Sequence, residues 1–465
     1  MADFAFLSIV ELGRLLRQKQ TSATELATYF LDRLERLGPR FNAVVTVTRE
    51  RALAEAAQAD REIKAGRWRG PLHGIPYGVK DLIATKDYPT TWGAEPYRQQ
   101  KFAADATVVE RLGAAGAVLV AKLAMVELAG GMGYNQANAS FTGPGKTPWN
   151  LNYWSGGSSS GPGAAVAAGL VPFAIGSETS GSILTPAAYC GVTGLRPTYG
   201  LVSRHGAMAL AWTMDKLGPL GRSAEDCGIV LFVIAGKDAK DPSSVDRNLR
   251  TMAESPTKRY RIGIPKGADK DIQPEVAANF RQALKVLADR VEVVEDVELP
   301  DLPYGAVAGM IIAAEGASAF DDLLKDGRLS QLTAPEDRTG GYPALAVSAP
   351  DYLRALRVRR PMQRALDDFL KKFGALAVPT RNTVANPLDK PFRDGWPGVT
   401  GGANVIGPTN VVGVPGISVP NGFGVQGLPT GLSFAARAFD EGKLISLARL
   451  YQSRTDWHRR QPTLT

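Results

Sequence analysis

Apolar side chains recur at helical spacing in the first part of the chain. Within residues 8–37, leucines and a phenylalanine return every three or four positions, which predicts two helices. The tetrapeptides SIVE (8–11) and SATE (22–25) each fit a capping box, so they mark where those helices begin. Residues 42–48 predict a strand, and residues 49–65 predict an exposed helix.

The rest of the chain alternates between short apolar strands and helices. Residues 71–83, PLHGIPYGVKDLI, combine a rigid Pro- and Gly-rich turn with a short apolar strand. The alternation predicts an α/β fold. Residues 325–347 are polar and glycine-rich, which indicates a loop or a lid. The further strands are expected at 117–121, 261–265, 291–297, 375–379, 416–420 and 428–436, and the further helices at 105–116, 225–235, 275–291, 351–373 and 441–452.

Composition and charge exclude several classes of protein. Hydrophobic residues make up 44% and charged residues 22% of the chain, which is typical of a globular domain that buries a large core. The net charge of +8 comes from scattered basic residues, so we expect no nucleic-acid partner. No basic leader precedes an apolar stretch, and the longest weakly polar run (164–175) is too short to span a bilayer. We therefore expect a cytoplasmic enzyme without a membrane partner.

No metal site is apparent either. Cys190 and Cys227 are the only cysteines, so neither a disulfide framework nor a cysteine-rich zinc site is available. The three histidines do not cluster with carboxylates. We expect no metal and no cofactor.

Two clusters of glycine and serine are the most unusual feature of the sequence. They span residues 156–161 and 176–182 and flank an alanine-rich apolar segment, 164–175, which predicts one small-residue helix between two loops. Glycines allow backbone N–H groups to approach a ligand closely, and serine hydroxyls can attack one. A flexible linker is the alternative, but a linker would not run directly into the apolar segment SILTPAAY.

Two familiar motifs match by chance. Residues 157–161 fit G-x-S-x-G, but the preceding residues are typical of a loop rather than of the strand that a nucleophile elbow requires. Residues 422–427 fit G-x-G-x-x-G, but Leu428-Pro429 follows where a dinucleotide site needs a helix.

A serine nucleophile needs a base, and histidine is scarce. His73 beside Gly74 is more typical of a structural residue, whereas Lys80 lies in an apolar strand. Burial would lower the pKa of Lys80 and make it a usable base. The alternative is a lysine that reaches solvent or pairs with Asp81. We predict that nucleophile, relay and base come from residues 182, 158 and 80, with an oxyanion held by backbone N–H groups of the second cluster.

The segments GGSSSGPGAAVAAG, GSETSGSILTPAAYCG and LHGIPYGVKD together resemble the amidase signature family, and the resemblance extends over nearly the whole chain. It implies one α/β domain with a mixed central β-sheet covered on both faces by helices. Its parts would be N-terminal helices (1–70), a signature core (71–235) and a C-terminal part that completes the sheet and the pocket (236–465). The reaction would need no cofactor.

The resemblance also assigns roles to individual residues. Ser182 would be the nucleophile, Ser158 a relay serine after a cis peptide bond, and Lys80 the base. The amides of Thr179, Ser180, Gly181 and Ser182 would form the oxyanion hole. The family hydrolyses amides through an acyl-enzyme.

Departures from the family pattern suggest the substrate. Leu184 stands where the family usually has an arginine, and Ala403 aligns with an aspartate that holds glutamine in the A subunits of glutamine-dependent tRNA amidotransferases. Both favour a neutral amide, either aryl or alkyl, with carbamates and esters as further classes. An amidotransferase A subunit is the alternative, and otherwise we expect a monomer or homodimer. Candidate pocket residues are Met132, Gly133, Tyr134, Trp154, Leu184, Trp212 and Trp396.

Overall fold

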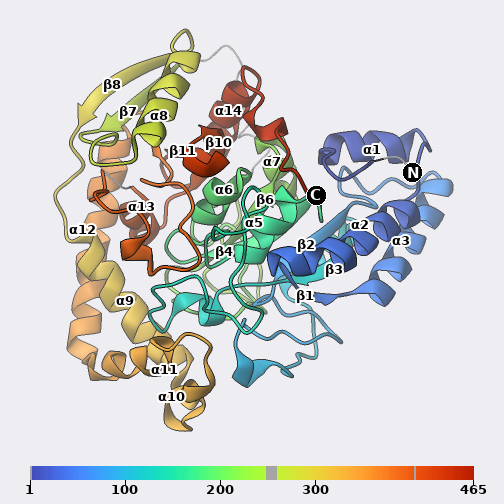
Figure 1. The fold of residues 1–465 in the computed structure, drawn as a ribbon, viewed down its shortest axis with the longest axis horizontal. Coiled ribbons are helices and arrows are strands. Elements are labelled where there is room, and N and C mark those ends of the chain that lie inside the picture. The colour runs from blue at the N-terminus through green and yellow to red at the C-terminus, as the bar shows by residue number, and fades with distance from the viewer. Residues whose placement is uncertain (1–2, 248–258, 403–404, 465) are drawn as a thin grey trace.

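The computed structural model describes residues 3–247, 259–402 and 405–464, and one sheet of eleven strands runs through the centre of that part (Figure 1). The strand order is β1-β3-β2-β4-β6-β5-β10-β11-β9-β7-β8. Strand β2 runs parallel to β3 and β4, and β7 runs parallel to β8 and β9, whereas the other pairs are antiparallel. The sheet is therefore mixed, as predicted. The strands are β1 (Val44–Val47), β2 (Pro76–Lys80), β3 (Val118–Leu123), β4 (Phe173–Glu178), β5 (Thr193–Arg196), β6 (Lys216–Gly221), β7 (Tyr260–Pro265), β8 (Val291–Val297), β9 (Ala375–Pro379), β10 (Gly416–Phe423) and β11 (Pro429–Ala435).

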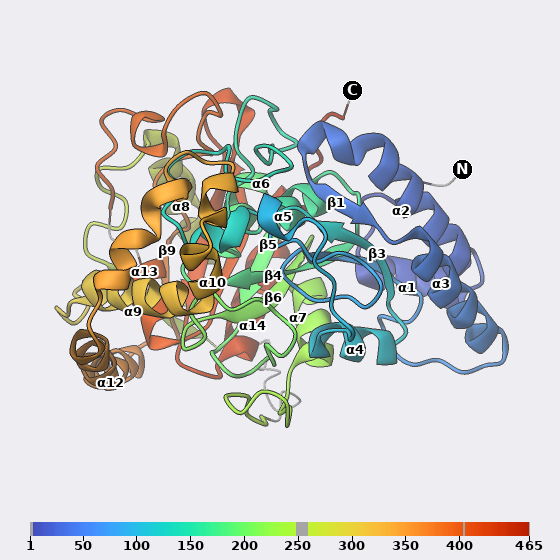
Figure 2. The ribbon, with the colours of Figure 1, turned by 90° about the horizontal axis from the view of Figure 1, so that it is seen from below.

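Helices cover both faces of the sheet. In Figure 2, α5 and α6 lie above the strands and α7 and α14 lie below them, while α9, α12 and α13 gather at one side of the molecule. The α/β fold with helices on both faces is confirmed. The helices are α1 (Ile9–Arg17), α2 (Ala23–Leu37), α3 (Arg49–Lys64), α4 (Thr107–Ala114), α5 (Ser160–Ala167), α6 (Leu184–Cys190), α7 (Ala224–Ile234), α8 (Pro274–Leu287), α9 (Tyr304–Ala319), α10 (Asp321–Lys325), α11 (Asp337–Gly340), α12 (Ala349–Leu370), α13 (Ile406–Val412) and α14 (Glu441–Gln452).

Both predicted capping boxes are present at the first two helices. Ser8 accepts a hydrogen bond from the backbone N–H of Glu11, whose side chain binds back to the Ser8 backbone. Ser22 and Glu25 make the same reciprocal pair at α2. The two helices begin where the sequence predicts because these side chains satisfy N–H groups that the first helical turn leaves without partners.

The segment between the two glycine and serine clusters differs from the prediction. Helix α5 begins inside the first cluster and ends at Ala167, where Gly169 adopts a φ of +60° that stops the helix. The chain then forms strand β4, which carries the start of the second cluster. The predicted single helix over 164–175 is wrong because Phe173 and Ile175 follow this stop and join the sheet beside β2.

Other differences lie in the second half of the chain. Helices α9 and α13 were not predicted, since α9 is apolar on most sides and α13 is short and glycine-containing. The segment 325–347 is not an open loop. It contains the short helical turns Arg328–Gln331, Asp337–Gly340 and Tyr342–Ala346.

Buried apolar side chains form one large core and one small cluster. The core draws residues from Ile9 to Tyr451, so all three predicted parts of the chain contribute to it. The small cluster, which we call the aromatic cluster, surrounds Trp154. None of the helices within the described ranges is long and apolar enough to cross a membrane.

Candidate active site

Lys80 ends strand β2, which lies between β3 and β4, and is completely buried. Its Nζ donates hydrogen bonds to Ser158 Oγ at 2.7 Å and to Ser177 Oγ at 2.9 Å. Burial lowers the pKa of Lys80 to about 7. Asp81 instead pairs with Lys122 at 2.9 Å, so the alternative of a Lys80–Asp81 ion pair is not realised. A buried lysine of this kind can lose its proton near neutral pH.

Ser158 is held by its backbone next to β3. The Gly157–Ser158 peptide bond is cis, as the family resemblance implies. The backbone N–H of Val126 donates to the Ser158 carbonyl at 3.1 Å. A Cβ at position 157 would lie 2.6 Å from the Trp154 ring and 2.8 Å from the Val126 side chain, so only glycine fits there.

Ser182 lies in the turn between β4 and α6. The turn includes Gly181 at a φ of +90°, a conformation that glycine adopts without strain. The backbone N–H of Ser159 donates to the Ser182 carbonyl at 3.2 Å, and the Ser159 hydroxyl donates to the Ser177 carbonyl at 3.2 Å. Ser159 thus joins the two clusters. The Ser182 hydroxyl bonds no other side chain or backbone group of the described residues, and its residue retains 9% exposure.

A buried ion pair supports the same turn from the sheet. Both Glu178 and Arg196 are fully buried, and Arg196 Nη1 lies 2.9 Å from Glu178 Oε1. The second oxygen, Oε2, accepts from the backbone N–H groups of Ile183 and Leu184 at 2.8 and 3.0 Å. Burial alone would raise the pKa of Glu178, but the charges of Arg196 and Lys216 and the hydrogen bonds lower it to about 2. The carboxylate therefore stays ionised and fixes the backbone just after Ser182.

Leu184, which departs from the family pattern, follows this pair in the core. Leu184 is 2% exposed and belongs to the large core. The guanidinium of Arg196 from β5 bonds Glu178, Thr409 and the Val414 carbonyl. Ala403, the second departure noted in the sequence, lies outside the described residues.

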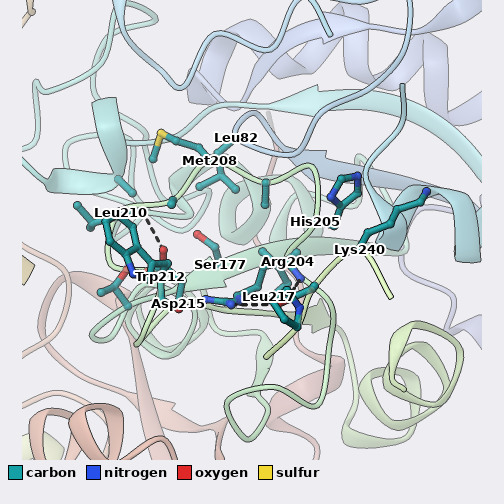
Figure 3. A pocket seen from close by; sticks show the side chains of 16 residues that line it. Leu82, Ser177, Arg204, His205, Met208, Leu210, Trp212, Asp215, Leu217 and Lys240 are labelled. Carbon is teal, nitrogen blue, oxygen red and sulfur yellow. Dashed lines mark hydrogen bonds and ion pairs between the residues drawn. The ribbon is translucent and has the colours of Figure 1, made fainter. Parts of the chain in front are cut away.

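A cavity of about 200 Å³ lies next to the site (Figure 3), but Lys80, Ser158 and Ser182 do not line it. Ser177 and Thr179 border it, so it approaches the hydroxyl that bonds Lys80. Trp212, a predicted pocket residue, lines it and is 39% exposed. The other lining residues are Leu82, Ala129, Arg204, His205, Ala207, Met208, Ala209, Leu210, Asp215, Leu217, Lys240, Asp241 and Pro242.

The other predicted aromatic residues lie in the aromatic cluster. The Trp154 ring stacks on Phe392 with centroids 4.4 Å apart and meets the edges of Tyr134 and Tyr189 at 6.1 and 6.2 Å. Trp396 stacks on Tyr153 in the same cluster. Trp154 is only 4% exposed, so its ring lies in the closed interior of this cluster, while Tyr134 and Phe392 are partly exposed at its edge.

Met132 and Gly133 belong to the segment that leads to Tyr134. Met132 is buried in the large core and contacts Gly340 and Gly341, whereas Gly133 is exposed. The substrate-binding roles of all these residues stay predictions, as do the roles of Lys80, Ser158 and Ser182.

Sequence reasoning did not single out Ser177, Ser159 or Arg196. Ser177 and Ser159 lie inside the two clusters, so the cluster pattern itself was their only signal. Arg196 is separated from Glu178 along the chain, and its role became visible only when β5 was placed. Within the ranges described above, no group of three or more His, Cys, Asp and Glu side chains could hold a metal ion.

Comparison with known proteins identifies the family. A family model described as Amidase matches residues 25–445. The chain belongs to the amidase signature family. Its predicted membership and its fold are thereby confirmed, and it is an amidase signature hydrolase.

Several relatives are similar over their full length. The A subunit of the glutamyl-tRNA(Gln) amidotransferase of Moorella thermoacetica is 38% identical, with 99% of each chain covered. The native peptide amidase from Stenotrophomonas maltophilia has a similar structure, with a TM-score of 0.88, 31% identity and 99% of each chain covered. A bacterial aryl acylamidase is similar in fold alone, with a TM-score of 0.84 at 24% identity over 98% of this chain and 97% of that one.

Proposed function

We propose that this chain hydrolyses the C–N bond of neutral aryl or alkyl amides through an acyl-enzyme on Ser182. The observation that carries the proposal is the buried Lys80, whose Nζ lies 2.7 Å from Ser158 Oγ and whose pKa is lowered to about 7 by burial. A neutral amine in that position can accept a proton from Ser158.

The reaction follows from this arrangement. Ser158 passes its proton to Lys80 and takes the proton of Ser182, whose oxygen attacks the substrate carbonyl carbon. Backbone amides of Thr179, Ser180, Gly181 and Ser182 would stabilise the resulting oxyanion. The C–N bond breaks as the leaving amine takes a proton from Lys80 through Ser158. Water then attacks the acyl-enzyme by the same proton route and releases the carboxylic acid.

The cavity supports a neutral and apolar substrate group. Aliphatic side chains, among them Leu82, Leu210 and Leu217, line part of it, beside charged ones such as Arg204 and Lys240. Arg196 is already occupied by Glu178, so it offers no free guanidinium to a substrate carboxylate. Carbamates and esters are further substrate classes, because the same acyl-enzyme route serves them.

A panel of substrates tests the proposal. We expect the purified chain to hydrolyse aryl and aliphatic amides, to act more weakly on glutamine, and to lose all these activities in Ser182→Ala. A carbamate and an ester in the same panel would show how far the specificity extends. Full activity of Ser182→Ala, or a clear preference for glutamine over every neutral amide, would contradict the proposal.

A second candidate function is that of the A subunit in a glutamine-dependent tRNA amidotransferase. It is favoured by the 38% identity to such a protein over 99% of each chain. The two functions separate in one experiment, in which the chain is assayed alone and after addition of the other components of a bacterial amidotransferase. Glutamine hydrolysis that appears only with the added components would support the second function.

A further inference from the structure

One carboxylate joins the wall of the cavity to the turn that carries Ser182. Asp215 precedes β6, directly beyond the point where Glu178 of β4 pairs with Lys216. Its Oδ1 accepts the hydroxyl of Thr179 at 2.5 Å. Its Oδ2 accepts the backbone N–H groups of Leu210 and Ala211 at 2.8 and 3.0 Å (Figure 3).

Among the described residues, the Asp215 side chain makes only these three hydrogen bonds, and it accepts all three. Both oxygens act as acceptors, which is the pattern of an ionised carboxylate. Asp215 is 8% exposed and borders the cavity itself. Charge-assisted hydrogen bonds in such a setting are short and directional, so the two segments they join are held at a fixed separation.

The segment that lines the cavity is also fixed just beyond Trp212. Glu315 of α9 accepts hydrogen bonds from the backbone N–H and the hydroxyl of Thr213 at 3.0 and 2.7 Å. The wall between residues 210 and 213 is thus held by a carboxylate on each side. Of these two carboxylates, only Asp215 bonds the turn that carries the nucleophile.

We propose that Asp215 is a positioning residue that couples occupation of the cavity to the alignment of Thr179–Ser182, the predicted oxyanion hole. The proposal rests on the function proposed above, in which the cavity receives part of the substrate. A group that fills the cavity presses against Leu210, the neighbour of Ala211. Because the Asp215 carboxylate bonds both these residues and Thr179, a shift of the cavity wall is transmitted to the turn that carries Ser182.

This coupling has a kinetic signature. Interactions that improve the alignment of the oxyanion donors act in the transition state, so they raise kcat rather than lower KM alone. A substrate with a bulky apolar group should therefore react faster at saturation than its small counterpart. The gain should depend on the hydrogen bond between Asp215 and Thr179.

The test compares matched substrates in three variants. Two pairs of amides are used, one differing only in the acyl group (acetyl or phenylacetyl) and one only in the amine (methylamine or aniline). The pair with the larger ratio of kcat for the bulky substrate to kcat for the small one in the native protein is then measured in all variants. Asp215→Asn and Thr179→Val each disrupt the link, whereas Thr179→Ser keeps the hydroxyl.

We expect Asp215→Asn and Thr179→Val to lower kcat for the bulky substrate on the order of 10²-fold, the size of effect that a small misplacement of reacting groups produces. The small substrate should change much less, and Thr179→Ser should retain the native ratio. Asp215→Asn should also move the acid limb of the pH profile to lower pH, because the charge of Asp215 raises the pKa of the nearby Lys80.

Three results would overturn the coupling. The first is that neither bulky substrate has a higher kcat than its small counterpart. The second is an unchanged ratio of these kcat values in Asp215→Asn and Thr179→Val. The third is an equal loss of kcat for both substrates, which indicates a purely structural role. Acylation of Ser182 is measured in parallel by intact mass. If Ser182 is acylated without a kcat gain, the coupling alone fails; if Ser182 is never acylated, the proposed function fails.

Discussion

Two apolar regions flank the same lysine, and they differ in how they are packed. The aromatic cluster touches Gly157, beside the Ser158 hydroxyl that bonds Lys80. The cavity touches Ser177, the other hydroxyl on Lys80. In the aromatic cluster large rings pack around the buried Trp154, whereas the cavity is open and is lined by aliphatic side chains together with charged ones such as Arg204.

This difference in packing suggests different roles, with the aromatic cluster supporting the site and the cavity recognising the substrate. Stacked rings fill space densely, so the aromatic cluster acts as a rigid wall behind the relay serine. Leucine and methionine side chains leave room and adapt to an apolar group. We infer that substrate preference depends on the open side, around Met208 and Leu210, more than on the tryptophan beside Gly157.

Lys80 lies where the two regions meet, and its loss should have the largest effect. Lys80→Met keeps the bulk of the side chain but removes the base, so kcat should fall by about 10²–10⁴-fold. In the native protein a protonated Lys80 cannot accept a proton. Activity should therefore rise with pH and level off above the lysine pKa of about 7.

A pH–rate profile of kcat/KM measures this directly. A profile that falls as pH rises through 7, or a Lys80→Met variant with native activity, would show that the base lies elsewhere.

Filling the open side should have an intermediate effect. Ala209 borders the cavity and is partly exposed, so Ala209→Trp can occupy the space with little disturbance of the core. For bulky amides we expect kcat/KM to fall about 10-fold, since overpacking costs ~1–3 kcal/mol. Acetyl amides of small amines should be affected less.

The matched change on the closed side is Phe392→Leu, which removes the ring that stacks on Trp154. Its main consequence should be a lower free energy of unfolding, by about 1 kcal/mol, with kcat/KM nearly unchanged. Thermal unfolding and steady-state kinetics of both variants check the contrast. If Phe392→Leu alters substrate preference and Ala209→Trp does not, the two regions have been assigned the wrong way round.

Much of the fold could be read from local pattern. The capping boxes at Ser8 and Ser22 and the apolar strand at Lys80 have signals contained within a few residues, and the structure places them accordingly. The two glycine and serine clusters are also visible in the sequence, and in the structure a backbone hydrogen bond from Ser159 to Ser182 joins them.

The rest depends on contacts between distant segments. Trp154 and Trp212 are similar in type, and nothing in the sequence shows that one packs into a closed cluster and the other borders an open cavity. Arg196 pairs with Glu178 only because β5 reaches the same buried region below the Ser182 turn. The helix expected over 164–175 failed because Gly169 ends α5 and strand pairing with β2 then decides the conformation of the following residues.

Formation of an acyl-enzyme on Ser182 can be measured by intact-protein mass spectrometry during turnover of a slowly hydrolysed aryl ester or amide. We expect a single acyl adduct, mapped to the peptide that contains Ser182 and absent from Ser182→Ala. Turnover without any adduct at Ser182, or an adduct on Ser158 instead, would contradict it.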